Sequence, residues 1–141
     1  MIRVLLVDDN GDMLTDLRDE LSADFDIAGT AENGEEAVRA VLRLDPDVVV
    51  LDLSMPVMNG LQVASILGEK RPRTKILFLT IHEEPEYVSA AFSVCACGYV
   101  TKRHMASDLA LAIREVFEGR NFLSPALQKQ DTDSAMGKIK N

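Results

Sequence analysis

The chain has 141 residues, of which 47% are hydrophobic and 27% are charged. This length suffices for one domain with a hydrophobic core that needs neither disulfides nor a structural metal. The net charge of -8 argues against the basic surface that a nucleic-acid-binding domain requires.

Neither a membrane span nor a secretion signal is evident. No apolar run approaches the ~20 residues that cross a bilayer, and the start Met-Ile-Arg-Val lacks the basic and apolar regions of a signal peptide. The two cysteines, Cys95 and Cys97, form one Cys-x-Cys and no disulfide framework. We therefore expect no membrane association and a cytoplasmic, reducing location.

Apolar runs alternate with amphipathic stripes along the first 120 residues. Strands are expected at 2–7, 25–31, 48–51, 76–79 and 98–101, where apolar and β-branched residues run together. Helices are expected at 11–23, after the capping pair Asn33 and Glu36, at 61–69, after Pro85 and from about Ser107. Five strand–helix units with short connections predict an α/β fold, a doubly wound five-stranded parallel sheet with helices on both faces.

Polar residues follow four of the expected strands. They are Asp8 and Asp9 after the first strand, Asp52 after the third, Thr80 after the fourth and Lys102 after the fifth. In an open α/β sheet, ligands bind outside the carboxyl ends of the strands. We therefore expect three carboxylates, a hydroxyl and an ammonium to meet at one edge of the sheet.

This set of groups favours phosphoryl chemistry. Oxygen ligands suit a hard divalent ion, Mg²⁺ or Mn²⁺, better than zinc or copper. Such an ion beside Lys102 and Thr80 provides charge neutralisation and a hydroxyl for a phosphoryl group in transfer. Asp52 is single and central, so it is the candidate nucleophile, which would become an acyl phosphate.

Four stretches together resemble the receiver domain of bacterial two-component response regulators. They are VLLVDDN at 4–10, DLSMPVMNG at 52–60, LT at 79–80 and GYVTK at 98–102. The resemblance covers roughly residues 1–120 and implies a CheY-like (βα)₅ fold. It also implies that Asp8 and Asp9 are the acidic metal pair, that Asp52 is the phosphoacceptor, and that the backbone carbonyl of Ser54 completes the metal site.

The same resemblance assigns a switch and partners. Thr80 and Lys102 would bind the phosphoryl group, and Tyr99 would turn inward when Thr80 moves toward it. A sensor histidine kinase would supply the phosphoryl group, and the surface of the last two helices and the fifth strand would change for a partner. A homodimer formed on phosphorylation is a candidate assembly. The chain would not be a turnover enzyme.

The segment Gly119–Pro125 is similar to the start of the linker in NarL/FixJ-type regulators, which leads to a helix-turn-helix domain. We therefore divide the chain into a receiver domain at 1–120 and a tail or truncated linker at 121–141, and expect DNA contact only through an output domain absent from this chain. A fragment of a transcription regulator is favoured over a stand-alone receiver.

Two other functions compete with a phosphorylation switch. A phosphate-independent binding module commonly lacks one of the acids or the lysine, and none is missing here. A haloacid-dehalogenase-like phosphatase needs a second acid two residues after its nucleophile, where this chain has Ser54. Ile81, after the switch threonine, is bulkier than the residue usual in the family. His82 occupies a position that varies among relatives and tunes dephosphorylation in them. His82 could equally be an exposed loop residue without a role.

Overall fold

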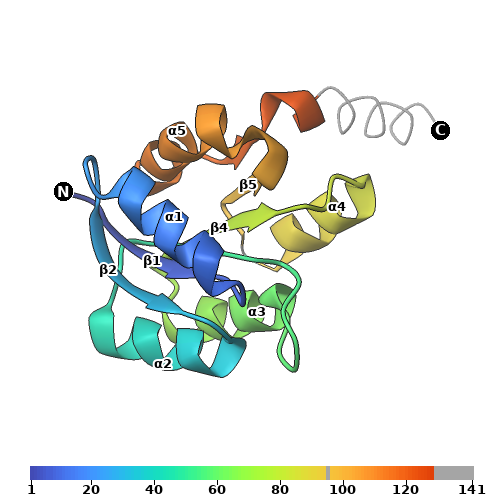
Figure 1. The fold of residues 1–141 in the computed structure, drawn as a ribbon. Helices are drawn as coiled ribbons and strands as arrows, with labels where there is room; N and C mark the ends of the chain where they lie inside the picture. The colour runs from blue at the N-terminus through green and yellow to red at the C-terminus, as the bar shows by residue number, and fades with distance from the viewer. Residues whose placement is uncertain (95, 129–141) are drawn as a thin grey trace.

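Five strands alternate with five α-helices along the chain, a short sixth strand follows, and residues 125–128 are again helical (Figure 1). This holds for residues 1–94 and 96–128, which the computed structural model describes. The elements are β1 (Arg3–Val7), α1 (Gly11–Leu21), β2 (Asp26–Ala31), α2 (Gly34–Leu44), β3 (Val48–Leu51), α3 (Gly60–Lys70), β4 (Lys75–Thr80), α4 (Pro85–Ser93), β5 (Gly98–Thr101), the 3₁₀ turn η1 (Lys102–His104), α5 (Met105–Phe117) and β6 (Phe122–Leu123).

All strands of the sheet run parallel, in the order β2-β1-β3-β4-β5-β6. β1 pairs with β2 on one side and with β3 on the other, so the direction in which the chain adds strands reverses at β1. Ligand sites in doubly wound sheets lie at such a reversal, outside the carboxyl ends of the strands. The predicted doubly wound parallel fold is confirmed.

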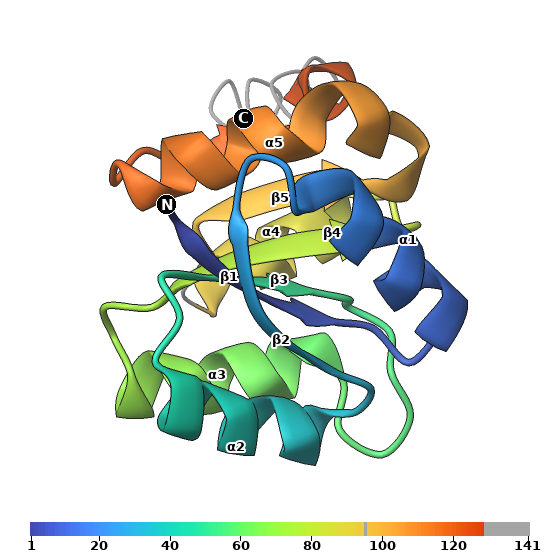
Figure 2. The ribbon, with the colours of Figure 1, turned by 60° about the vertical axis from the view of Figure 1, so that its left-hand side comes forward.

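The sheet is the middle of three layers. α1 and α5 cover one face, and α2, α3 and α4 cover the other (Figure 2). Each layer boundary holds its own apolar core, which explains why the continuous apolar run of β3 is buried at all four positions. Within the described part of the chain, no helix combines the length and apolar character needed to cross a membrane.

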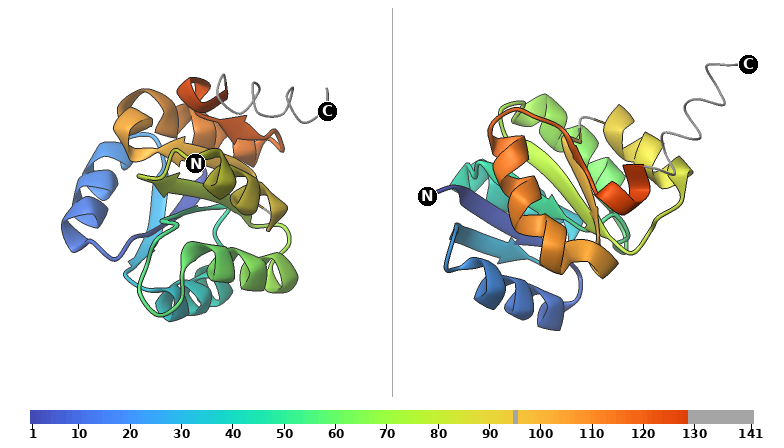
Figure 3. Two further views of the ribbon diagram at one scale, coloured as in Figure 1. Left: turned by 90° about the vertical axis from the view of Figure 1, so that its right-hand side faces the viewer. Right: turned by 90° about the horizontal axis from the view of Figure 1, so that it is seen from above.

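The sequence predicts five strands, whereas the sheet of the described residues has six. Residues Phe122 and Leu123 form β6, which pairs with Gly98 and Tyr99 of β5, and the chain returns along the sheet edge after α5 (Figure 3). A two-residue strand is too short to show a period, so hydrophobic patterning does not detect it. Of the predicted tail at 121–141, residues 129–141 lie outside the described residues.

Candidate functional site

Three carboxylates meet at the carboxyl ends of β1 and β3. Asp8 and Asp9 follow β1 and Asp52 follows β3, and each offers an oxygen that lies within 4.8 Å of the other two. Asp8 and Asp52 are only 2% and 6% exposed, whereas Asp9 is exposed. The site is therefore half enclosed, with one acidic side chain facing solvent.

Asp8 is fixed by two donors. The backbone N–H of Asn10 donates to Asp8 Oδ1 over 2.9 Å, and Lys102 Nζ donates to Asp8 Oδ2 over 2.8 Å. The Asn10 side chain in turn accepts hydrogen bonds from the first turn of α1, as a helix N-cap does. The start of α1 thus holds the acidic turn in one conformation.

Asp52 is fixed by the loop that follows it and by the same lysine. The backbone N–H of Ser54 donates to Asp52 Oδ1 over 3.2 Å, and Lys102 Nζ lies 3.5 Å from Asp52 Oδ2. The single ammonium therefore bridges carboxylates from β1 and β3, although it comes from the end of β5.

Burial and the neighbouring charges shift the pKa values of Asp52 and Lys102. Burial raises the pKa of Asp52 above its ordinary value; the positive charge of Lys102 opposes this, and the charge of Asp8 adds to it. For Lys102, burial alone would lower the pKa, but the hydrogen bond to Asp8 and the charge of Asp52 raise it above its ordinary value. One ammonium for three carboxylates leaves negative charge, and this all-oxygen donor set fits a hard divalent cation.

Gly60 allows helix α3 to begin close to the site. Its N–H donates to the carbonyl of Leu53 over 2.8 Å. A Cβ at this position would lie 2.3 Å from the backbone oxygen of Asp52 and 2.8 Å from the Cα of Leu53. Backbone atoms cannot move aside as the end of a side chain can, so only glycine permits this approach.

Val57, in the loop between β3 and α3, has a strained backbone. Its φ is +68°, a region that costs an L-residue about 1–2 kcal/mol and disfavours β-branched side chains most. The side chain is 96% exposed, so packing does not compensate for this cost.

Val57→Gly is expected to raise the free energy of unfolding by about 0.5–1 kcal/mol, because glycine tolerates this φ and its added chain entropy offsets only part of the gain. Chemical denaturation measures the change. Val57→Ala, which keeps a Cβ, should give a smaller gain, and an equal gain from both variants would contradict backbone strain as the cause.

A chain of contacts connects Thr80 to the loop after Asp52. The Thr80 hydroxyl is fully buried and accepts a hydrogen bond from the His82 N–H over 3.3 Å. His82 Nε2 and Ser54 Oγ are hydrogen-bonded at 2.5 Å, and the imidazole stacks on Tyr87 at 4.1 Å. Among residues 1–94 and 96–128, no hydrogen bond joins the Thr80 hydroxyl to the three carboxylates.

The sequence allows two interpretations of His82, a residue that tunes dephosphorylation or an exposed loop residue without a role. The structure places its half-buried ring against Ser54 and Tyr87. A histidine two residues after Thr80 was the only sequence signal, and the contacts depend on a loop conformation that spacing does not determine. Ile81, the bulky neighbour, is 69% exposed. Of the two cysteines of the Cys-x-Cys pair, Cys95 lies outside the described residues.

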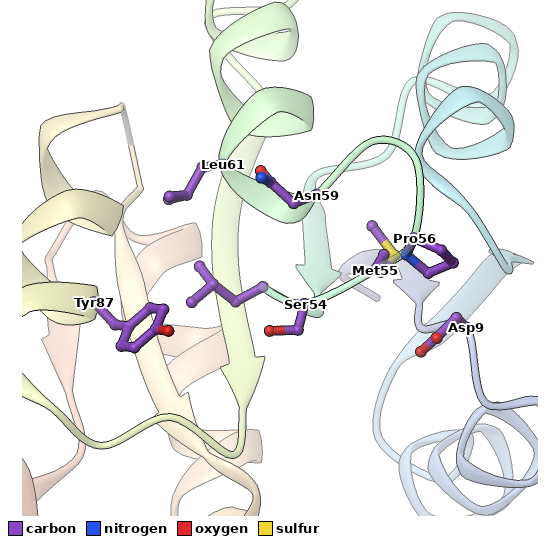
Figure 4. A pocket seen from close by; sticks show the side chains of 8 residues that line it. Asp9, Ser54, Met55, Pro56, Asn59, Leu61 and Tyr87 are labelled. Atoms are coloured by element: carbon purple, nitrogen blue, oxygen red, sulfur yellow. The ribbon is translucent and has the colours of Figure 1, made fainter.

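A pocket of about 450 Å³ opens beside the acidic cluster, with Asp9 and Ser54 on its rim (Figure 4). Tyr87 at the start of α4 and Leu61 at the start of α3 line the other side. The pocket therefore lies between the starts of these two helices and the acidic cluster.

Tyr99 is buried in the inward position. Its side chain is completely inaccessible, its hydroxyl donates to the backbone carbonyl of His82 over 2.8 Å, and its ring centroid lies 6.4 Å from that of Phe78 on β4. Burial, together with the charge of Glu84, raises the pKa of this hydroxyl above its usual range. The residue expected to turn inward is thus connected, through His82, to Thr80 and Ser54.

A comparison with protein-family models identifies residues 4–114 as a response regulator receiver domain. The chain is 40% identical over 129 residues to the uncharacterized transcriptional regulatory protein YvfU of Bacillus subtilis, covering 90% of this chain and 64% of that protein. It is 36% identical over 133 residues to the response regulator GacA of Pseudomonas viridiflava, covering 92% of this chain and 62% of that protein. The chain therefore spans less than two thirds of the length of these relatives.

Solved structures of response regulators have the same fold as this chain. A two-component response regulator of the LuxR family from Aurantimonas sp. superimposes with a TM-score of 0.91 at 27% identity, over 95% of this chain and 97% of the other. The receiver domain of a NarL regulator from Mycobacterium tuberculosis gives a TM-score of 0.80 at 29% identity, over 84% and 98%.

Proposed function

Because this chain belongs to the family of response regulator receiver domains, we propose that it is a phosphorylation-controlled switch with Asp52 as phosphoacceptor. Receiver domains are signalling modules. The observation that carries the proposal is the meeting of three carboxylates and Lys102 at the edge between β1 and β3. A phosphate-independent binding module would not need all three carboxylates and the lysine. Their joint presence therefore supports a switch that depends on phosphorylation.

Each group of the site has a role in the proposed transfer. An oxygen of Asp52 forms a bond to phosphorus while the bond between phosphorus and the imidazole nitrogen of a donor phosphohistidine breaks. Lys102 faces the incoming oxygens as a fixed positive charge and keeps its proton. Asp8, Asp9, Asp52 and the backbone carbonyl of Ser54 would hold Mg²⁺ (or Mn²⁺), which when bound neutralises charge on the phosphoryl oxygens.

The response is proposed to run through Thr80 and Tyr99. A phosphoryl group on Asp52 adds acceptor oxygens and about two negative charges, and the Thr80 hydroxyl reaches one of them by moving toward Asp52. Thr80 and Tyr99 already share His82 as a neighbour. Phosphorylation would therefore favour the inward Tyr99 over an outward one, as a shift between two conformations.

The family to which the chain belongs supports a choice of partners. We propose a sensor histidine kinase in the cytoplasm as the donor and a homodimer on phosphorylation as the responding assembly. The relatives named above include a transcriptional regulatory protein of which the chain covers 64%. This supports an output domain, outside residues 1–141, as the part that contacts DNA.

Mass spectrometry of the chain after incubation with acetyl phosphate and Mg²⁺ tests the proposal. One phosphoryl group should be added, peptide mapping should place it on Asp52, and a chelator should prevent the reaction. Acetate leaves as the bond from its oxygen to phosphorus breaks. Absence of label with Mg²⁺, or label at another residue, would overturn the assignment of Asp52.

A further inference from the structure

We propose that Phe122–Gln128, here called the C-terminal clamp, holds Tyr99 inward, so that docking of the clamp depends on the state of Asp52. This inference rests on the proposed function, because it takes the inward Tyr99 as the state that a phosphoryl group favours. The clamp occupies an edge of the sheet that would otherwise be free.

Backbone hydrogen bonds fix the clamp along β5. The Phe122 N–H donates to the carbonyl of Cys97 over 2.9 Å, and the Ser124 N–H donates to the carbonyl of Tyr99 over 3.0 Å. The Ser124 hydroxyl accepts from the Thr101 N–H over 3.4 Å, and Ser124 is completely buried. The clamp thus bonds directly to the main chain of the switch residue.

Side chains of the clamp enter both cores. Leu127 is 2% exposed and belongs to the same apolar cluster as Tyr99, together with Val88 of α4, and Leu123 packs against this cluster. Phe122 packs against the cluster on the opposite face of the sheet. With Leu127 buried on one face and Phe122 partly buried on the other, the segment is docked against the domain.

The position of the clamp restricts the movement of Tyr99. β5 lies between β4 and β6, and the inward ring lies toward β4, beside Phe78. An outward ring would move toward β6, where Leu123 is paired with Tyr99. Packed interiors have little spare volume, so the docked clamp and the outward ring exclude each other.

This exclusion makes the coupling reciprocal. A ligand that favours the inward Tyr99 stabilises the docked clamp, and the docked clamp must raise the affinity for that ligand by the same factor. The C-terminal clamp would then be docked on the edge of β5 or released from it, according to the state of Asp52.

Beryllofluoride with Mg²⁺, a mimic of the phosphoryl group, tests the clamp in the full chain. Leu127→Ala should weaken beryllofluoride binding by about fivefold or more in calorimetric titration and speed hydrogen exchange of the Ser124 amide. Leu42→Ala, at a 39% exposed leucine on α2 and away from the last two helices, is the matched control and should change neither value. Ser124→Ala is the milder second variant, which removes only the bond to Thr101, and should weaken binding in the same direction.

The outcomes separate the clamp from the proposed function. Wild-type protein that does not bind beryllofluoride would overturn the function and the clamp together. Wild-type binding with an unchanged affinity in Leu127→Ala and Ser124→Ala, despite faster exchange at Ser124, would overturn the clamp alone. In a Tyr99→Ala background Leu127→Ala should have no further effect on affinity, and a full additional effect would also contradict the clamp.

Discussion

Asp52→Asn is expected to abolish labelling by acetyl phosphate. The amide has the size of the carboxylate, and its oxygen can still accept the hydrogen bond from Ser54, but it cannot become an acyl phosphate. Intact-mass measurement over time gives the rate. Asp19→Asn, at an exposed position on α1, is the control and should label like the wild type.

The same variant should change how stability depends on pH. The folded-state pKa of Asp52 is raised, so the folded protein binds the proton more tightly than the unfolded chain. Its contribution to stability is therefore present at low pH and is lost as pH rises through the folded-state pKa. Asp52→Asn should remove this decline in metal-free thermal melts. Label retained in Asp52→Asn would instead mean that another residue accepts the phosphoryl group.

Gly60→Ala is expected to lower the free energy of unfolding by about 3 kcal/mol, the upper range for an overpacked core. The added methyl group would overlap the backbone oxygen of Asp52 at 2.3 Å, and the ring of Phe78 at 2.9 Å blocks a second direction of relief. The melting temperature should fall by roughly 10 °C. Labelling of Asp52 should slow as well, because the clash moves the backbone of this residue.

Gly11→Ala separates this effect from a general intolerance of alanine. A Cβ at Gly11 meets only the end of the Glu32 side chain, at 3.2 Å, which can rotate away. Alanine also suits a helix better than glycine. Gly11→Ala should therefore be neutral or slightly stabilising, and a loss as large as that of Gly60→Ala would contradict the steric argument.

The acidic edge could be predicted from sequence because a parallel sheet imposes it. Once β1, β3 and β5 are recognised as parallel strands, Asp8, Asp52 and Lys102 must share one edge, whatever the loops do. Their meeting in the structure, with Lys102 between the two acids, depends only on strand periodicity and direction.

Features that depend on loop conformation or on single contacts could not be predicted. The stacking of His82 on Tyr87 requires a particular path for the loop between β4 and α4. The burial of Leu127 follows from the two-residue strand β6, which has no period to detect. The left-handed backbone of Val57 contradicts the preference of its residue type, so local propensity gives the wrong expectation there.

The position of Lys102 has a consequence for how the protein comes to be ready for its signal. Its ammonium lies 2.8 Å from Asp8 and 3.5 Å from Asp52, and it is a counterion tethered to the chain. A tethered ion has an effective concentration that the surrounding medium cannot dilute. Assembly of the acidic edge therefore does not wait for a cation from solution. A divalent cation and a phosphoryl donor then meet an edge whose charged side chains are already in place.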